Sequence, residues 1–215
     1  MEYFDHCFIE RDTLETSDVV NGGAELFLYQ SGYLTIKGYD DGVYILGFPN
    51  FEVRKALYRV VVPALTMKSN SEVVSAQSFL RKMMQDGNTA EAKKALKALI
   101  ADVPYSNKKM ASMDMEERYR LIMSTIFRAL GFRVEVERML ATGRIDMIVE
   151  VPSIIYVLEL KLSNNGGISA AESQIKDKSY TEPFKADKRK VIALAVELDE
   201  TGKGLIDWKE VDEGV

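Results

Sequence analysis

Residues 143–162 have the sequence GRIDMIVEVPSIIYVLELKL, which predicts the centre of the fold. Two apolar runs within this segment, over residues 144–151 and 155–162, have the length and composition of β-strands. Side chains of a strand alternate between its two faces. Glu159 and Lys161 are therefore expected on one face of the second strand, where both can meet a single bound group.

Charged side chains inside these apolar runs indicate chemistry rather than packing. Burying Glu159 and Lys161 without partners would cost several kcal/mol. The alternative is an edge strand whose polar face lies in water, and the Glu-Leu-Lys tripeptide taken alone favours that alternative. Asp146 on the first strand changes the balance, because a carboxylate on one strand with a carboxylate and an ammonium on the next can hold Mg²⁺ against a phosphodiester.

The composition of the 215-residue chain describes a soluble globular protein with 47% apolar and 28% charged residues, enough for one full domain and a smaller one. No apolar run approaches the roughly 18 residues of a membrane span. Residues 1–10 are acidic and lack the basic start of a secretory signal. We therefore expect a cytoplasmic protein with no membrane partner.

Two rare residue types limit the chemistry further. One cysteine, Cys7, excludes an internal disulfide framework and a cysteine-rich metal site. One histidine, His6, lies in a stretch with little sign of structure, and a solvated N-terminal histidine is the favoured interpretation over a triad or zinc ligand. Catalysis would then use carboxylates, lysine, tyrosine or hydroxyls, and any metal would be a hard cation with oxygen ligands.

The formal net charge of -5 disfavours nucleic-acid binding through bulk charge, although a local basic groove is compatible with it. Lys93, Lys94 and Lys97 are an example of local positive charge. We interpret them as a solvated helix face in preference to a nucleic-acid contact.

Three parts follow one another along the chain. Residues 1–67 predict a winged or lid-like module, in which a helix, a hairpin turning at Asp41-Gly42, and a helix capped by Asn50 succeed each other. Residues 68–113 predict a helical linker with helices over 72–84 and 89–100, broken at Gly87-Asn88. Residues 114–215 alternate helix and strand, as expected of an α/β domain.

Within the third part, we expect a helix over 115–130 that ends at Gly131, because its apolar residues recur at helical spacing. Strands are expected over 132–137, 144–151, 155–162 and 191–198, with a helix over 169–178 before the last strand.

The order of these elements and their polar residues resembles the PD-(D/E)XK nuclease superfamily, in the branch found at the C-terminus of AAA-ATPase-like proteins. The residues that carry the resemblance are Glu116, Arg118, Tyr119, Val136, Glu137, 143–146 (GRID), 155–161 (IYVLELK), 174–178 (QIKDK), Tyr180 and 206–208 (IDW). Residues 28–36, 46–50 and 52–54 resemble the segment that joins the ATPase-like domain to the nuclease in that branch. The resemblance implies a restriction-endonuclease-like core, which is a mixed central sheet flanked by helices.

The resemblance also implies a metal-dependent nuclease that acts on nucleic acid, more readily DNA than RNA. Asp146 and Glu159 would bind Mg²⁺ or Mn²⁺ with the Leu160 carbonyl, and Lys161 would orient the attacking water. Glu116 is the first candidate for an additional outer carboxylate, ahead of Glu117.

Further positions are expected to serve the substrate. Gln174 and Tyr180 would orient the site, although a helix-surface amide and a packed tyrosine explain them equally well. Arg144, Lys176 and Lys178 would contact the substrate, and a basic rim would continue through Lys185, Lys188, Arg189 and Lys190. Arg120 departs from the family, in which His or Gln is frequent at that place.

A different class of function stays open, namely a catalytically silent nuclease fold that binds or regulates an ATPase-like assembly. The chain contains no Gly-x-x-x-x-Gly-Lys-Ser/Thr motif, so we predict no ATP binding. We expect the C-terminal portion of a longer ATPase-like protein, or a short natural relative of one. The apolar residues between 26 and 46 make a homodimer plausible.

Overall fold

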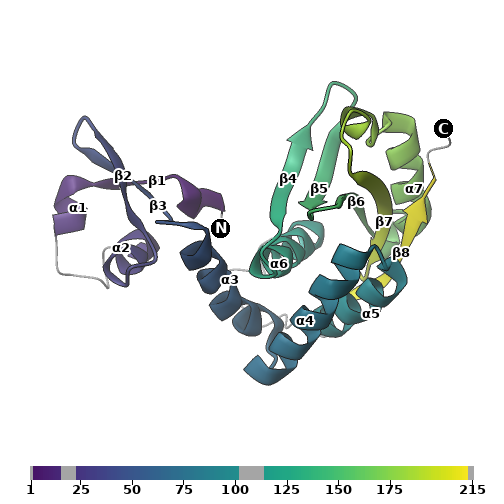
Figure 1. Cartoon of the computed structure of the whole chain (residues 1–215), viewed down its shortest axis with the longest axis horizontal. Coiled ribbons are helices and arrows are strands. Elements are labelled where there is room, and N and C mark those ends of the chain that lie inside the picture. The colour runs from purple at the N-terminus through teal and green to yellow at the C-terminus, as the bar shows by residue number, and fades with distance from the viewer. Residues whose placement is uncertain (1, 16–22, 102–113, 213–215) are drawn as a thin grey trace. The chain divides into compact units, whose positions relative to one another are not determined.

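The structure is a computed structural model in which residues 2–15, 23–101 and 114–212 are described (Figure 1). Its contacts divide the chain into two compact units, Met1–Tyr58 and Arg59–Val215. The three-part division at residues 67 and 113 remains a proposal about how the chain is organised. None of the helices in the described ranges is long and apolar enough to cross a membrane.

The first unit is built on a three-stranded antiparallel sheet in the order β1-β3-β2. Its elements are η1 (Glu2–Asp5), β1 (Cys7–Glu10), α1 (Arg11–Glu15), α2 (Gly23–Gln30), β2 (Thr35–Asp40), β3 (Val43–Gly47) and the start of α3 (Phe51–Thr66).

The predicted hairpin and helix cap of this unit are confirmed. Asp41 and Gly42 join β2 to β3 with φ angles of 39° and 85°, the positive values that a two-residue hairpin turn needs. Asn50 Oδ1 accepts a hydrogen bond from the Val53 N–H at 2.9 Å, which caps α3. The region around His6 is more regular than expected, because β1 follows it directly and pairs with β3.

The second unit contains a five-stranded sheet in the order β4-β5-β6-β7-β8, in which only β6 and β7 pair in parallel. The strands are β4 (Arg133–Met139), β5 (Arg144–Glu150), β6 (Ile154–Leu162), β7 (Lys190–Leu198) and β8 (Leu205–Val211). The helices are α4 (Asn70–Asp86), α5 (Thr89–Ile100), α6 (Met115–Ala129) and α7 (Gly167–Lys178), with short 3-10 turns η2 (Ser163–Asn165) and η3 (Glu182–Phe184). This mixed sheet flanked by helices confirms the predicted fold class.

The position of β6 decides between the two interpretations of Glu-Leu-Lys. β6 lies in the middle of the sheet, and residues 154–160 are all buried. The edge strand with a water-facing polar side is therefore wrong. On β5, residues 145–149 are buried without alternation, because both faces of an interior strand are covered.

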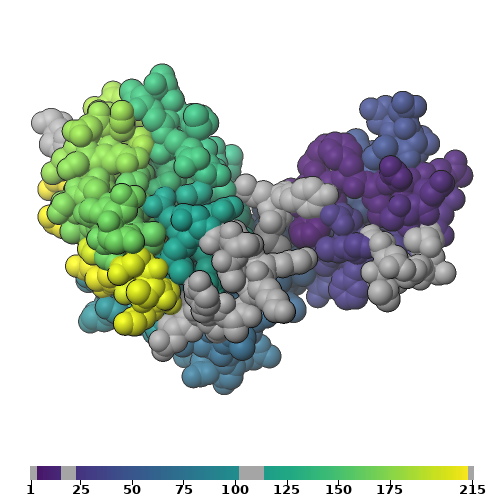
Figure 2. Space-filling model, turned by 180° about the vertical axis from the view of Figure 1, so that it is seen from behind, coloured from purple at the N-terminus to yellow at the C-terminus, as the bar shows by residue number. Residues whose placement is uncertain are grey.

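Helices cover both faces of this sheet. Ala171 and Ile175 of α7 share a buried cluster with Val157 of β6. The neighbouring Tyr156 points to the other face, where its hydroxyl donates to the Met84 carbonyl of α4 at 2.6 Å. Figure 1 shows α4 and α5 in front of the sheet, and Figure 2 shows from behind the face that α7 covers.

The caps of α4 and α5 explain why the first helix ends and the second begins at Gly87-Asn88, as the sequence predicts. Ser69 and Glu72 form a capping box at the start of α4, which begins at Asn70, two residues before the expected start. Gly87 ends α4 in the left-handed conformation with φ of 72°, and Asn88 caps α5. The indole N–H of Trp208 donates to the Thr89 carbonyl at 2.9 Å, so the predicted helical segment is fixed to the sheet.

Strand β8 has no counterpart among the expected elements. Its buried residues Leu205, Trp208 and Val211 recur every third position, with two exposed residues between them. A strand is predicted from a period of two, and a shift of register between Glu197 and Leu198 of β7 accompanies this departure.

Candidate active site

The centre of the site is the place where β5 and β6 stop pairing through their backbones. Their antiparallel register runs from Glu150–Ile155 to Met147–Leu158. Beyond this last pair, the Leu160 N–H donates a hydrogen bond to the side chain of Asp146, at 2.9 Å from Oδ2. Continuing the register places Asp146 opposite Glu159, so two acidic side chains lie beside each other in the interior of the sheet.

Both carboxylates are withdrawn from water. Asp146 is 4% exposed and Glu159 is fully buried. Lys161 Nζ donates to Glu159 Oε1 at 2.7 Å. Glu159 Oε2 is buried and has no hydrogen-bond partner among the described residues. Because buried polar atoms in proteins are nearly always paired, this oxygen is left available for a cation.

The charges of the site perturb one another. Burial, followed by the charge of Asp146, raises the pKa of Glu159 to about 8. Burial alone would lower the pKa of Lys161, but its hydrogen bond to Glu159 and the nearby carboxylates outweigh burial and raise the pKa. Lys161 therefore stays a cation. Its single positive charge does not balance the negative charges of both Asp146 and Glu159. Such perturbed groups cluster at functional sites.

Helix α6 brings a third acidic residue and an arginine to this centre. Asp114 caps the helix by accepting from the Glu116 N–H at 3.2 Å. Burial, and then the charge of Asp146, raises the pKa of Glu116. Arg120 lies between them, with Nη2 at 3.5 Å from Glu116 Oε1 and 4.0 Å from Asp146 Oδ1. Glu117 is exposed, which agrees with its lower rank as a site residue.

Glu137 also belongs to the site. In the sequence it is one of the residues that carry the resemblance, but no function in the site is predicted for it. It lies between the paired positions Val136–Met147 and Arg138–Ile145 of β4 and β5, with a φ of 55°, which is uncommon for a residue other than glycine. Its Oε1 lies 2.7 Å from both Arg120 Nη1 and Arg144 Nη1. Sequence alternation places Glu137 on a polar strand face and gives no sign of this left-handed conformation.

Gln174 and Tyr180 form a chain of hydrogen bonds that ends on β5. Gln174 Nε2 donates to the Tyr180 hydroxyl at 3.0 Å, and this hydroxyl donates to the Arg144 carbonyl at 2.7 Å. A Cβ atom at Gly143 would lie 3.1 Å from the Tyr180 hydroxyl, which accounts for a glycine before Arg144. Tyr180 is fully buried, so it fixes the start of β5.

The predicted basic rim is partly neutralised. Lys176 and Lys178 are exposed, as is the side chain of Arg144 beyond its contact with Glu137. Arg189, in contrast, pairs with Asp187 at 2.7 Å and with Glu150 at 2.9 Å. The exposed Lys185 is paired with Glu182, and Lys188 and Lys190 are exposed.

The described residues contain no group of three or more His, Cys, Asp or Glu side chains that could hold a metal ion. Asp146 and Glu159 therefore stand as a pair. Glu116 is close enough for the charge of Asp146 to raise its pKa, and it contacts Arg120. It does not form a group of three metal-ligating side chains with Asp146 and Glu159.

This fold and arrangement are consistent with a restriction-endonuclease-like protein, and residues 114–208 match the family model of the PD-(D/E)XK nuclease superfamily. The match begins at the cap of α6 and ends in β8, so it includes every site residue described above. A match to this superfamily suggests a metal-dependent nuclease.

Over its wider length the chain is similar to the "Uncharacterized protein in vnfD 5'region" of Azotobacter chroococcum mcd 1, with 26% identity over 209 residues. The alignment covers 91% of this chain and 39% of that protein, so the chain spans about two fifths of its relative's length. No solved structure matches the chain.

Proposed function

We propose that this protein is a Mg²⁺- or Mn²⁺-dependent nuclease that hydrolyses phosphodiester bonds of nucleic acid, DNA in particular. The observation that carries the proposal is the buried and unpartnered Glu159 Oε2 beside Asp146. The two buried carboxylates repel each other, and a bound cation would stabilise them beyond the single hydrogen bond that Lys161 donates to Glu159.

The residues present fit such an ion. Asp146 and Glu159 would hold it together with the Leu160 carbonyl, an all-oxygen set that suits a hard cation. Mg²⁺ in proteins usually keeps several waters and is held by one or two carboxylates, so a third acidic ligand is not required. When bound, the cation would polarise the scissile phosphate and lower the pKa of the attacking water. Glu116 would act as an outer carboxylate.

The remaining residues would position the substrate and stabilise charge. Lys161 stays protonated and is held by Glu159, so it would orient the attacking water and stabilise negative charge that develops on the phosphate. Gln174 and Tyr180 would act through the start of β5, which carries Asp146. Arg144, Lys176 and Lys178 would contact phosphates of the strand from the exposed surface.

Cleavage of supercoiled and single-stranded DNA in Mg²⁺ or Mn²⁺ tests the proposal. The variants Asp146→Asn, Glu159→Gln and Lys161→Ala are expected to lose cleavage. Asp207→Asn is the matched control, because Asp207 is an exposed carboxylate on β8 that pairs with Lys93 outside the site. Cleavage that persists in all three site variants would contradict the assignment, as would the absence of cleavage with every metal and nucleic acid.

Arg120 favours a second function, a catalytically silent module. Its guanidinium contacts Glu116 and lies 4.0 Å from Asp146, so it supplies positive charge that a metal would otherwise supply. A silent module would bind neither Mg²⁺ nor Mn²⁺, whereas Arg120→Gln would restore metal binding. Metal binding by the unchanged protein would exclude this function.

We further propose a place for the site in a larger cytoplasmic assembly. Residues 1–67 would correspond to the end of an AAA-ATPase-like domain, residues 68–113 to a helical linker, and residues 114–215 to the nuclease-like domain. The resemblance of residues 28–36, 46–50 and 52–54 to such a junction supports this division. A homodimer or an ATPase-like partner would complete the assembly, and light scattering on the purified chain distinguishes a dimer from a monomer.

A further inference from the structure

A pocket of about 320 Å³ lies in the second unit, away from the carboxylate site. It is lined by α3, α4 and the end of α6 through Arg59, Pro63, Asn70, Val73, Val74, Gln77, Ser78, Arg81, Ala129 and Leu130. Glu116 and Ala129 are 13 residues apart on α6, which corresponds to about 20 Å along a helix. The pocket is thus a separate feature of the fold.

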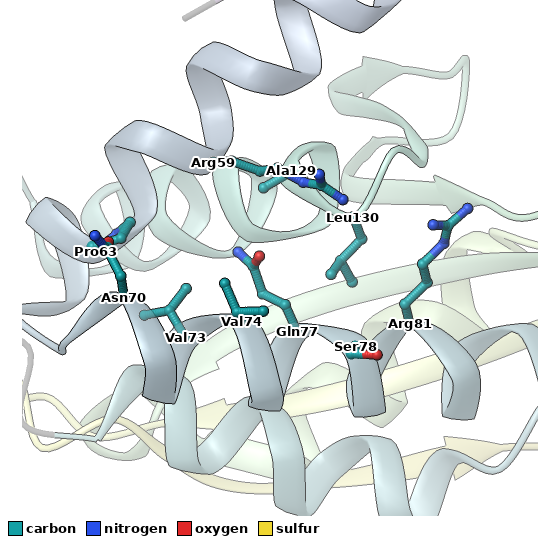
Figure 3. Close-up of a pocket in the computed structure, with 10 residues that line it drawn as sticks. All are labelled: Arg59, Pro63, Asn70, Val73, Val74, Gln77, Ser78, Arg81, Ala129 and Leu130. Carbon is teal, nitrogen blue, oxygen red and sulfur yellow. The ribbon is translucent and has the colours of Figure 1, made fainter.

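The first sign of a ligand is a buried amide without a partner. Gln77 is 7% exposed, and its Nε2 has no hydrogen-bond partner among the described residues. In Figure 3 its side chain points from α4 into the pocket, between Val74 and Leu130. A buried amide nitrogen that is left unpaired costs free energy, so a bound acceptor would remove this cost.

The second sign is the charge around the pocket. Arg59 and Arg81 line it, and the described residues that line it include no aspartate or glutamate. Both arginines are exposed, and neither guanidinium has an ion pair or hydrogen bond within the described part of the chain. Both extend toward the Leu130 end of the pocket in Figure 3, while Asn70 and Pro63 close the other end. Guanidinium groups bind phosphate through paired hydrogen bonds.

The other residues that line the pocket indicate which kind of group would accompany the phosphate of a ligand. Val73, Ala129 and Leu130 give an apolar wall, and Asn70 and Ser78 add neutral hydrogen-bonding groups. The volume lies at the lower end of the roughly 300–1,000 Å³ found for small-molecule pockets, which exceeds the need of a bare anion. A ligand that suits this lining has a phosphate for the arginines and a flat, largely apolar ring with polar edges for the apolar wall and the amide.

We propose that this pocket binds a free mononucleotide, with its phosphate between Arg59 and Arg81 and its base against the apolar wall within reach of the Gln77 amide. This site is independent of the proposed nuclease activity. It needs no divalent cation and no residue of the carboxylate site.

Isothermal titration calorimetry on the full chain in EDTA tests this proposal, with deoxyadenosine monophosphate as the probe. We expect saturable binding with a Kd below about 1 mM. Deoxyadenosine, which lacks the phosphate, and inorganic phosphate, which lacks the base, should each bind at least about tenfold more weakly.

Binding by substituted proteins tests which residues contact the ligand. Arg59→Gln with Arg81→Gln should weaken binding at least about tenfold, because both charge-assisted contacts are lost. Gln77→Leu should weaken binding while leaving the melting temperature unchanged or higher, since it removes an unpaired buried amide. Lys82→Gln is the matched control, because Lys82 is an exposed cation next to Arg81 that does not line the pocket. The control should bind like the unchanged protein.

Four results would overturn the proposal. The first is the absence of binding by the monophosphate. The second is unchanged binding in the double arginine variant. The third is loss of binding in Glu159→Gln, which would move the ligand to the carboxylate site. The fourth is binding of a 5'-phosphorylated oligonucleotide through Arg59 and Arg81 without binding of the mononucleotide, which would assign the pocket to a nucleic-acid strand.

Discussion

Replacing Glu159 by glutamine should stabilise the metal-free protein at high pH. The folded protein raises the pKa of Glu159 from its ordinary 4.5 to about 8. A carboxyl group with a raised pKa in the folded state contributes most to stability at pH values below its unfolded pKa. Its contribution falls as the pH rises through the folded pKa, because the folded protein must then hold an unfavourable charge.

The size of this effect follows from the same two values. A difference from 4.5 to about 8 corresponds to at most about 5 kcal/mol between pH 4 and pH 9. The pKa of about 8 already includes the favourable effect of Lys161 on the charged carboxylate, so this value needs no further deduction. We therefore expect Glu159→Gln to be at most about 5 kcal/mol more stable than the unchanged protein at pH 9. At pH 5, where the folded protein holds Glu159 protonated, the two should differ by no more than about 1 kcal/mol.

Urea denaturation in EDTA at both pH values measures this difference. Glu150→Gln is the control, because Glu150 already pairs with Arg189 and its substitution should lower stability at both pH values. Mg²⁺ at 100 times its Kd should reduce the difference at pH 9 by about 2.7 kcal/mol, because it stabilises the unchanged protein and not the variant. A Glu159→Gln variant that is less stable at pH 9 in EDTA, with an unchanged pH dependence, would show that the folded protein does not raise the pKa of Glu159.

Three further substitutions test the supports of the site by thermal or urea denaturation. Tyr180→Phe should cost about 1 kcal/mol, because it removes the part-buried hydrogen bond to the Arg144 carbonyl; a neutral result would show that water replaces the hydroxyl. Ser69→Ala should cost about 1 kcal/mol through loss of the α4 capping box, and an equal loss in Ser71→Ala would contradict that cause. Glu137→Gly should be about 1 kcal/mol more stable than Glu137→Ala, because glycine accepts the φ of 55° without strain; the reverse order would show that no strain is stored there.

Much of the second unit could be predicted from the sequence because its signals are local. The helical spacing in α6, the capping residues around Gly87, and the apolar runs of β5 and β6 each report their own element. The placement of Glu159 and Lys161 on one face follows from alternation alone. Their direct contact of 2.7 Å agrees with it.

The parts that escaped prediction depend on tertiary structure. Strand β1 has four residues, too few for a convincing pattern, and is recognised only by its pairing with β3. Strand β8 has buried residues at every third position. The bridging role of Glu137 depends on a left-handed backbone and on two arginines from other elements, none of which a single sequence reveals. The burial of Glu159 likewise depends on the central position of β6.

Electron paramagnetic resonance at pH 8 measures whether the full chain binds Mn²⁺ through Asp146 and Glu159. We expect saturable binding that is lost in Asp146→Asn and in Glu159→Gln and retained in Asp207→Asn. Binding that is unaffected by the substitutions at Asp146 and Glu159, or no binding by the unchanged protein, would show that these carboxylates do not form a metal site.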